Sequence, residues 1–214
     1  MKHLYPLLIL LMGTLLVACS KETSKDGPQF GNCEYAPYTI GSSFSYSNIK
    51  NDSKDTFNYT LTVSGDTTIR GTTYKKIGDD SVFTGSNCKD GVYTQIASMP
   101  TYQGGRADDL KLTYLREYMP QGSIWLDTIK IVNAQDTSTG ILLYTILDRG
   151  ITKAVNGKNY LEVISVRTDA YSVMHGGPVP AGTIATRYYA KGVGLIEEDK
   201  PTDTTRITSY ILKP

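Results

Sequence analysis

Apolar and polar residues alternate along most of the chain, in runs bounded by glycine, aspartate and asparagine. Seven runs show this period of two and are rich in Tyr, Thr, Val and Ile: 42–49, 55–65, 90–98, 110–118, 159–173, 183–192 and 205–212. The pattern is typical of antiparallel strands that bury one face. Only residues 107–115 are also compatible with a short helix. The sequence therefore predicts an all-β fold built around an antiparallel curled sheet.

Short motifs recur between the two halves of this region, which suggests an internal repeat. The matches pair Gly41-Ser42-Ser43-Phe44 with Gly122-Ser123-Ile124-Trp125, Gly71 and Tyr74 with Gly157 and Tyr160, and 90–93 with 186–189. They predict repeats at 35–118 and 119–214, each a meander of four or five strands within one β domain over 35–214. Chance agreement between strands of similar composition is the alternative.

The N-terminus does not show the alternation of apolar and polar residues. A basic start is followed by an apolar run over 4–16 and then by Leu16-Val17-Ala18-Cys19. Residues 1–18 are therefore predicted to be a secretory signal peptide, because their apolar run is too short for a retained membrane helix. The last four residues resemble the bacterial lipobox, which implies cleavage before Cys19 and a diacylglycerol on its sulfur. An ordinary signal peptide, with Cys19 incidental, is the alternative.

The polar, turn-rich residues 19–34 predict a flexible tether between the lipid and the domain. Several acyl chains, at about 0.8 kcal/mol per buried methylene, would hold Cys19 in the membrane permanently. Ser20 fits the outer-membrane sorting rule of enteric lipoproteins, and Lys21-Glu22 loosely resembles the surface-export signal of Bacteroidota lipoproteins. We therefore expect a lipoprotein of the outer membrane, on its periplasmic or its surface-exposed face.

The charge and the cysteine content of the mature chain bear on its binding partners and on its disulfides. Removing the signal takes Lys2 away and leaves 21 basic against 21 acidic side chains, so no basic field exists to bind nucleic acid. We expect a monomer without nucleic-acid partners. Once Cys19 carries lipid, Cys33 and Cys88 remain in an oxidising compartment, and their spacing matches no zinc motif. They predict a disulfide.

Candidate catalytic groups are sparse. His175 is the one histidine of the mature chain and lies in a loop rich in glycine and proline. The carboxylate runs Asp79-Asp80, Asp108-Asp109 and Glu197-Glu198-Asp199 fit solvated turn charges, with calcium binding by the first or last run as an alternative. We predict no enzyme activity, no cofactor and no metal site. Trp125 fits a buried core position, or alternatively a platform for stacking sugars.

A family resemblance is carried by three stretches. "TRYYAKGVGLIEED" from Thr186, the Gly-Ser-x-Trp opening at Gly122 and the Val-Asn-Gly-Lys-Asn-Tyr hairpin at Val155 resemble a group of uncharacterised Bacteroidota lipoproteins. The resemblance implies an extracytoplasmic β fold similar to the half-open barrel of lipoprotein carriers, and it assigns no catalytic or binding residue.

Four triplets also resemble the Asp-Ser/Thr-apolar sequon for O-glycosylation in Bacteroidota. The acceptors would be Thr67, Ser81, Thr128 and Thr204.

Three functions from different classes fit these features. The favoured one is a non-enzymatic binding module for a glycan, a peptide or an envelope partner. A carrier or sensor of an apolar ligand inside the curled sheet is the alternative, and a hydrolase with an unrecognised site is the least supported. An apolar cavity would favour the carrier, and an exposed row of aromatic side chains would favour the binding module.

Lipidation makes the first testable prediction. Labelled palmitate should enter the wild-type protein, and Cys19→Ala should abolish labelling and release the protein into the soluble fraction, because the acylated sulfur is lost. Equal labelling of both proteins would contradict a lipid anchor at Cys19.

Overall fold

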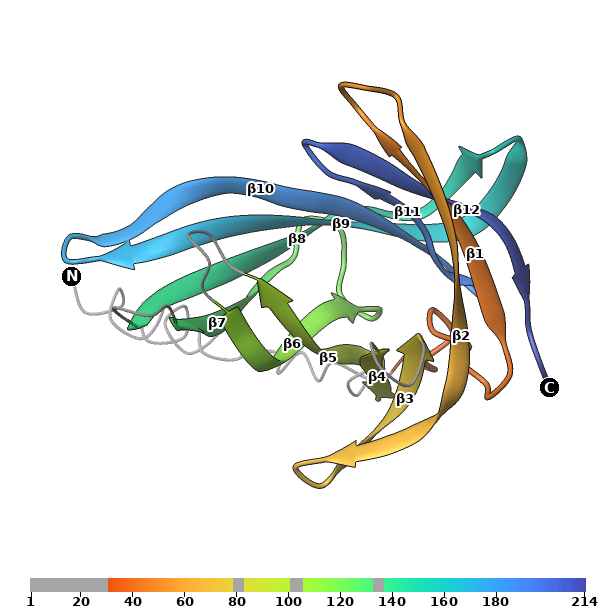
Figure 1. The fold of residues 1–214 in the computed structure, drawn as a ribbon, viewed down its shortest axis with the longest axis horizontal. Helices are drawn as coiled ribbons and strands as arrows, with labels where there is room; N and C mark the ends of the chain where they lie inside the picture. Colours follow the sequence, from red (N-terminus) through yellow and green to blue (C-terminus); the bar gives the residue numbers. More distant parts are fainter. Residues whose placement is uncertain (1–30, 79–82, 101–105, 133–136) are drawn as a thin grey trace, which may run out of the picture.

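The computed structural model describes residues 31–78, 83–100, 106–132 and 137–214, which form twelve antiparallel strands and no helix (Figure 1). No helix that could span a membrane occurs among these residues. The all-β prediction is confirmed, and the ambiguous segment 107–115 is part of a strand. The strands are β1 (Ser43–Lys50), β2 (Thr56–Ile69), β3 (Thr72–Gly78), β4 (Phe83–Lys89), β5 (Val92–Pro100), β6 (Arg106–Arg116), β7 (Ile124–Val132), β8 (Thr137–Val155), β9 (Lys158–Met174), β10 (Gly177–Ala190), β11 (Gly194–Asp199) and β12 (Asp203–Ile211).

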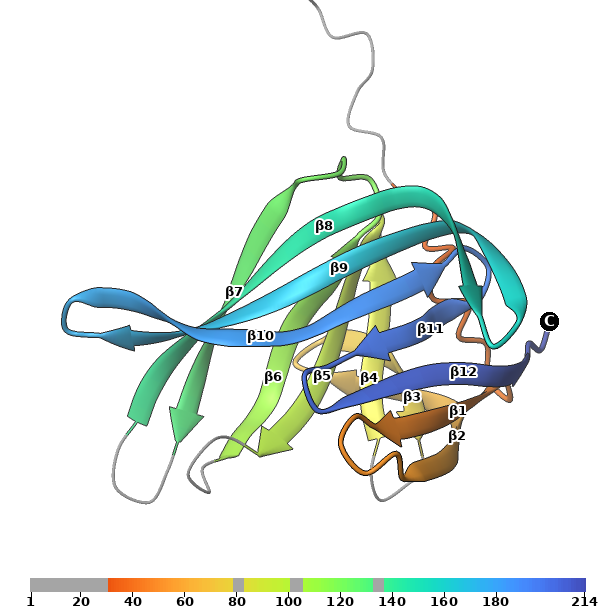
Figure 2. The same cartoon turned by 90° about the horizontal axis from the view of Figure 1, so that it is seen from above.

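Each strand pairs with its neighbour in sequence, and β12 pairs with β1, so the sheet curls into a nearly closed barrel (Figure 2). One seam stays largely unsealed, since the only backbone pair between β6 and β7 in the described residues joins Arg106 to Val132. The half-open barrel expected from the sequence matches this arrangement. Beyond the barrel wall, the hairpin of β9 and β10 projects as a long arm (Figures 1 and 2).

Side chains of β7 bridge the open seam. The Trp125 indole Nε1 donates to the Thr113 carbonyl at 2.6 Å, and the Thr113 amide donates to Asp127 Oδ2 at 2.6 Å. Both backbone groups of Thr113 are thereby satisfied without a strand ladder, which matters because unpaired buried backbone groups are costly. Burial raises the pKa of Asp127, and the Thr113 amide opposes that shift.

The starts of β1 and β7 share the same local geometry. The amides of Gly41 and Gly122, both at positive φ (86° and 82°), donate to the carbonyls of Val63 and Ile146 at 2.8 Å. The matched Phe44 and Trp125 are both buried.

The glycines after β2 and β8 are alike as well. Gly71 and Gly157 both lie in tight turns, at φ 78° and 77°, each after a residue at φ 49°. These positive φ pairs favour type I′ hairpins.

Two details of the predicted repeat are wrong. The segments 35–118 and 119–214 contain six strands each rather than four or five. The match of 90–93 with 186–189 also fails, because Asp90 and Gly91 form the turn between β4 and β5 whereas 186–189 lies inside β10. Similar alternation in all strands allowed a false alignment here.

Buried side chains, many of them tyrosines, form two clusters inside the barrel. The first cluster comes from β5 to β10 together with Tyr35, and it includes Trp125 stacked on Tyr144 at 5.3 Å. The second gathers residues of β1, β2 and the later strands around Phe44 and Ile196. Burial of Trp125 confirms its expected core position.

The seam generates a stability prediction. Trp125→Ala should lower the free energy of unfolding by about 3 to 5 kcal/mol, because it removes a buried aromatic and leaves the Thr113 carbonyl unpaired. The adjacent Leu126 is 57 % exposed, so Leu126→Ala should change stability by no more than about 0.5 kcal/mol. Urea denaturation followed by circular dichroism measures both. Equal effects of the two substitutions would contradict the assigned role of Trp125.

Candidate functional site

The segment before β1 is fastened to the barrel at several points. Cys33 forms a disulfide with Cys88 of β4, with Cα atoms 5.8 Å apart. The Glu34 carbonyl accepts the Gly192 amide at 2.8 Å, and the Tyr38 ring packs edge-on against Phe44. The expected disulfide is therefore present, and the last residues of the predicted tether, Cys33 and Glu34, are held by the barrel.

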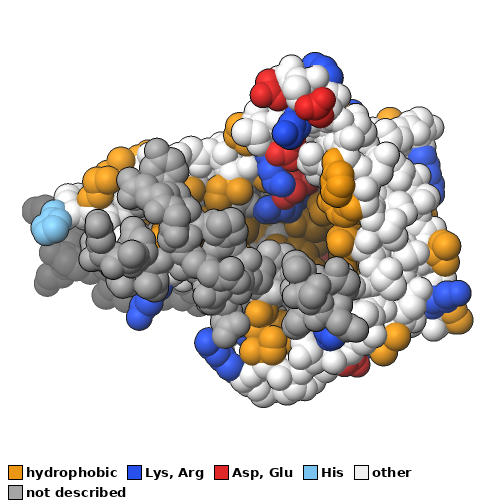
Figure 3. Space-filling model, in the orientation of Figure 1, with side chains coloured by type: hydrophobic (Ala, Val, Ile, Leu, Met, Phe, Trp, Pro, Cys, Tyr) orange, Lys and Arg blue, Asp and Glu red, His pale blue; other side chains and the backbone are white. Residues whose placement is uncertain are grey.

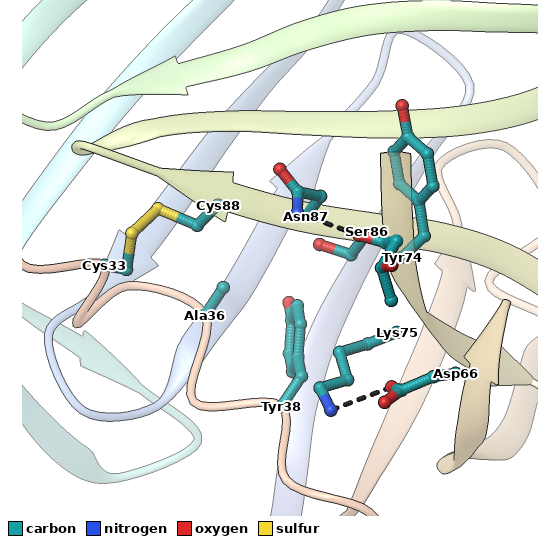
Figure 4. Close-up of a pocket in the computed structure, with 10 residues that line it drawn as sticks. Cys33, Ala36, Tyr38, Asp66, Tyr74, Lys75, Ser86, Asn87 and Cys88 are labelled. Carbon is teal, nitrogen blue, oxygen red and sulfur yellow. Dashed lines mark hydrogen bonds and ion pairs between the residues drawn. A yellow bond between two sulfur atoms is a disulfide. The ribbon is translucent and has the colours of Figure 1, made fainter. Parts of the chain in front are cut away.

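This fastening leaves a pocket of about 330 Å³ between the segment and strands β2 to β4 (Figure 4). The disulfide and Tyr38 form one side, and an ion pair between Lys75 Nζ and Asp66 Oδ1, 2.8 Å long, lies on the other. Asn87 donates its amide to the Thr73 carbonyl at 2.8 Å. Asp66, Lys75 and Asn87 are thus engaged by other residues of the pocket wall.

A buried carboxylate, Glu117, lies where the segment enters the barrel. Its Oε2 accepts the Tyr93 hydroxyl in a short hydrogen bond, and its Oε1 accepts the Cys33 amide at 3.3 Å. The Arg149 guanidinium donates to the Glu117 backbone carbonyl. The Tyr93 hydroxyl also accepts the Tyr35 amide at 3.0 Å. These bonds hold the N-terminal segment in place, which is a structural use of Glu117.

A third group of polar side chains crosses five adjacent strands near the ends of β1, β2, β11 and β12. Cross-strand register pairs Phe57 with Asn48, Asn48 with Thr205, Thr205 with Glu198, and Glu198 with Arg187. Directly paired residues share a face of a sheet, so the five side chains form one row, here called the rim row. Tyr46, two positions before Asn48, is buried in the core, which puts the rim row on the inner face.

Ion pairs and hydrogen bonds link the rim row. Arg187 Nε lies 2.7 Å from Glu198 Oε1, and Lys200 Nζ lies 2.9 Å from Glu198 Oε2. Asn48 donates its amide to Asp203 Oδ1 at 2.6 Å and to the Thr205 hydroxyl at 2.8 Å.

The pKa shifts of this network follow from these contacts. Burial alone would raise the pKa of Asp203, but hydrogen bonds from Thr202 and Asn48 and the charge of Lys200 hold it below its usual value. Burial would lower the pKa of Lys200, yet the Glu198 carboxylate raises it. Both groups are therefore charged at neutral pH.

The network corrects the sequence-based interpretation of Glu197-Glu198-Asp199. These residues were expected in a solvated turn or at a calcium site, but they lie within β11 on alternating faces. Glu198 faces inward with Arg187, whereas Glu197 pairs with Lys153 at 2.7 Å and Arg206 at 2.9 Å. Opposite faces prevent the two carboxylates from sharing a cation. The described residues contain no group of three metal-ligating side chains.

An aromatic stack begins at the rim row. Phe57 and Tyr59 lie nearly parallel, with ring centroids 5.9 Å apart, and Tyr59 stacks on Tyr46 at 5.6 Å. Tyr46 is buried whereas Phe57 is 67 % exposed, so the stack leads from the core into solvent. Figure 3 shows basic, acidic and hydrophobic side chains meeting in a hollow on this side of the molecule. Sequence reasoning missed Phe57, although its place at the start of an alternating strand marked it as a rim aromatic.

The other predicted residues are spread over the molecule. His175 is exposed in the turn between β9 and β10, at the end of the projecting arm. Among the glycosylation candidates, Thr128 is exposed and Thr67 and Thr204 are half-buried. Ser81, Asp79, Asp80 and the lipidation candidate Cys19 lie outside the described residues.

Comparison with known proteins supports the fold. No protein-family model matches the chain, and no curated protein matches it. A solved structure of a predicted exported protein with a YmcC-like fold from Bacteroides fragilis is 10 % identical, with a TM-score of 0.50, and the match covers 82 % of this chain and 97 % of that one. A predicted lipoprotein from Parabacteroides distasonis is also 10 % identical, with a TM-score of 0.47, over 87 % of this chain and 100 % of its own.

The disulfide provides a prediction about the fastened segment. Replacing both cysteines, as Cys33→Ala with Cys88→Ala, should lower the free energy of unfolding by about 4 kcal/mol, because a 55-residue separation is no longer closed in the unfolded chain. Urea denaturation with and without reductant measures this effect. Reductant should destabilise the wild type and leave the double variant unchanged. Two alkylatable thiols in unreduced mature protein would contradict the bond.

Proposed function

We propose that this chain is a membrane-anchored, extracytoplasmic module that binds a glycan, a peptide or an envelope partner at the rim row and does not catalyse a reaction. Lipid on Cys19 would hold it in the outer membrane as a monomer, without nucleic-acid partners. The observation that carries the proposal is an aromatic stack that ends in the exposed Phe57, next to a paired polar network on the inner face of the barrel end.

The side chains at and behind the rim row argue against the alternative of an apolar-ligand carrier. Behind the rim row, Tyr46, Tyr114 and Tyr189 occupy the space with buried side chains. Burial raises the pKa of each of these phenols. At the rim itself, Arg187 and Glu198 present charges where an acyl chain would need an apolar wall.

The geometry of the titratable groups favours binding over catalysis. Acid-base chemistry needs a group poised to exchange a proton with a substrate, whereas Glu198 is committed to two cations and Glu117 to the N-terminal segment. His175 stands exposed at the end of the arm, with no carboxylate among its sequence neighbours from 170 to 182.

The proposal is tested with the mature lipidated protein in a polyoxyethylene detergent, which contains no sugar. Polar ligands extracted from the native envelope, both glycans and peptides, should bind the wild type and bind Phe57→Ala at least about tenfold more weakly, because the exposed ring is lost. His175→Ala serves as the control and should bind as the wild type does.

Saturable binding of a fluorescent fatty acid, unaffected by Phe57→Ala, would replace the proposal with the carrier. Hydrolytic activity of the purified wild type that disappears in His175→Ala would show that the protein is an enzyme.

A further inference from the structure

We infer that the ligand of the rim row is an uncharged glycan that stacks a sugar ring on Phe57 and receives hydrogen bonds from the side chains beside it. This inference rests on the proposed function and adds the class of ligand. Four features of the row support an uncharged glycan: its length, the hydrogen-bonding groups of its side chains, its equal numbers of positive and negative charges, and the pairing of the strands beneath it.

The row has the dimensions of an extended ligand. It runs across β2, β1, β12, β11 and β10, and four strand spacings of about 4.8 Å give a length of roughly 19 Å. Phe57 stands at one end and Arg187 at the other, with Asn48, Thr205 and Glu198 between them. A ligand lying along the row therefore meets the ring of Phe57 first and then the polar groups of Asn48, Glu198 and Arg187, whereas Thr205 is buried beneath them.

The side chains offer what a sugar needs. One face of a pyranose carries C–H groups that pack on an aromatic ring, and its rim carries hydroxyls that both donate and accept hydrogen bonds. Phe57 provides the ring face, being 67 % exposed. Arg187 and Lys200 supply donors, and Glu198 and Asp203 supply acceptors. Because these groups already hold one another in place, little ordering is left for the ligand to impose.

Charge balance selects against an ionic ligand. The row and its partners contain two cations, Arg187 and Lys200, and two anions, Glu198 and Asp203, each within 3.7 Å of an opposite charge. A charged ligand would have to break one of these ion pairs and leave a partly buried charge uncompensated, which is costly. An uncharged ligand leaves every pair intact.

The backbone disfavours a peptide. Extended peptides usually bind by adding a strand to a free sheet edge. The strands below the row, from β2 through β1, β12 and β11 to β10, are each paired with the next, so no edge is available within the row. Recognition there depends on side chains alone, as is usual for carbohydrates.

The experiment titrates the mature lipidated protein, in polyoxyethylene detergent, with uncharged gluco-, galacto- and manno-tetrasaccharides, the matching uronic-acid oligomers, and a polar tetrapeptide. At least one uncharged tetrasaccharide should bind, with an affinity that does not change between low and high salt. Phe57→Ala and Phe57→Leu should each weaken this binding about tenfold, since both remove the ring face. Asn48→Ala should weaken it as well. Tyr118→Ala, a half-exposed tyrosine outside the row, is the matched control and should leave the affinity unchanged.

Four outcomes would overturn the inference, the last of them from the fatty-acid titration described for the proposed function. If no uncharged tetrasaccharide binds at up to millimolar concentrations, or if Phe57→Ala and Tyr118→Ala behave alike, the row is not a glycan site. If only the uronic-acid oligomers or the peptide bind, and Phe57 is required, the inference fails while the proposed function stands. Binding of a fatty acid but of no polar ligand would reject both.

Discussion

The structure depends on closing a curled sheet whose two halves meet at a seam with almost no backbone ladder. Free strand edges are unstable and invite aggregation. Here side chains of β7 satisfy the edge of β6 at Thr113, where Trp125 bonds the carbonyl and Asp127 bonds the amide. The side chains of Trp125 and Asp127 lie on the inner face of β7. The same local arrangement therefore closes the barrel wall at this point and places Trp125 in the core. The remaining strands then keep an unbroken order, which allows residues from five strands to share the rim row.

Tyrosine side chains have two roles in this barrel. Their rings pack in the interior, and their hydroxyls join parts of the chain that are distant in sequence. A buried tyrosine contributes a large apolar ring but needs a partner for its hydroxyl. Tyr35 donates to the Glu162 carbonyl at 2.8 Å, Tyr46 donates to the Leu195 carbonyl at 3.0 Å, and Tyr114 bonds the Ser86 hydroxyl at 3.1 Å. Packing therefore explains the eight tyrosines that are buried among the described residues, and their rings are unavailable to a ligand. Phe57 differs because it lies near the start of β2 and is 67 % exposed.

Features that depend on local chemistry could be predicted from the sequence. Features that depend on which residues of neighbouring strands pair could not. Alternation identified seven of the twelve strands and missed β3, β4, β7, β8 and β11. The Asn156-Gly157 pair identified the turn between β8 and β9, and the compartment identified the disulfide. The carboxylates of β11 were misplaced, because a run of acidic residues looks alike in a turn and in a strand. Bulges such as the one between Tyr188 and Tyr189 change which residues face inward, and no residue pattern marks them. The rim row could not be found from sequence for the same reason, since it exists only through the pairing of five strands.

The charges of the rim row would be poor stabilisers if the barrel merely had to fold. Moving Arg187 and Glu198 out of water costs free energy that their attraction only partly returns, and apolar residues of similar volume would often serve stability as well. At the other end of the row, Phe57 exposes an apolar ring to water, which is unfavourable relative to burying it. Both costs become understandable if a ligand covers the row, because it would shield Phe57 from water while using donors and acceptors that the network already orients. The rim row thus combines charges with an exposed ring, whereas the core is built from packed tyrosines, and this difference is in keeping with the proposed binding role of the rim row.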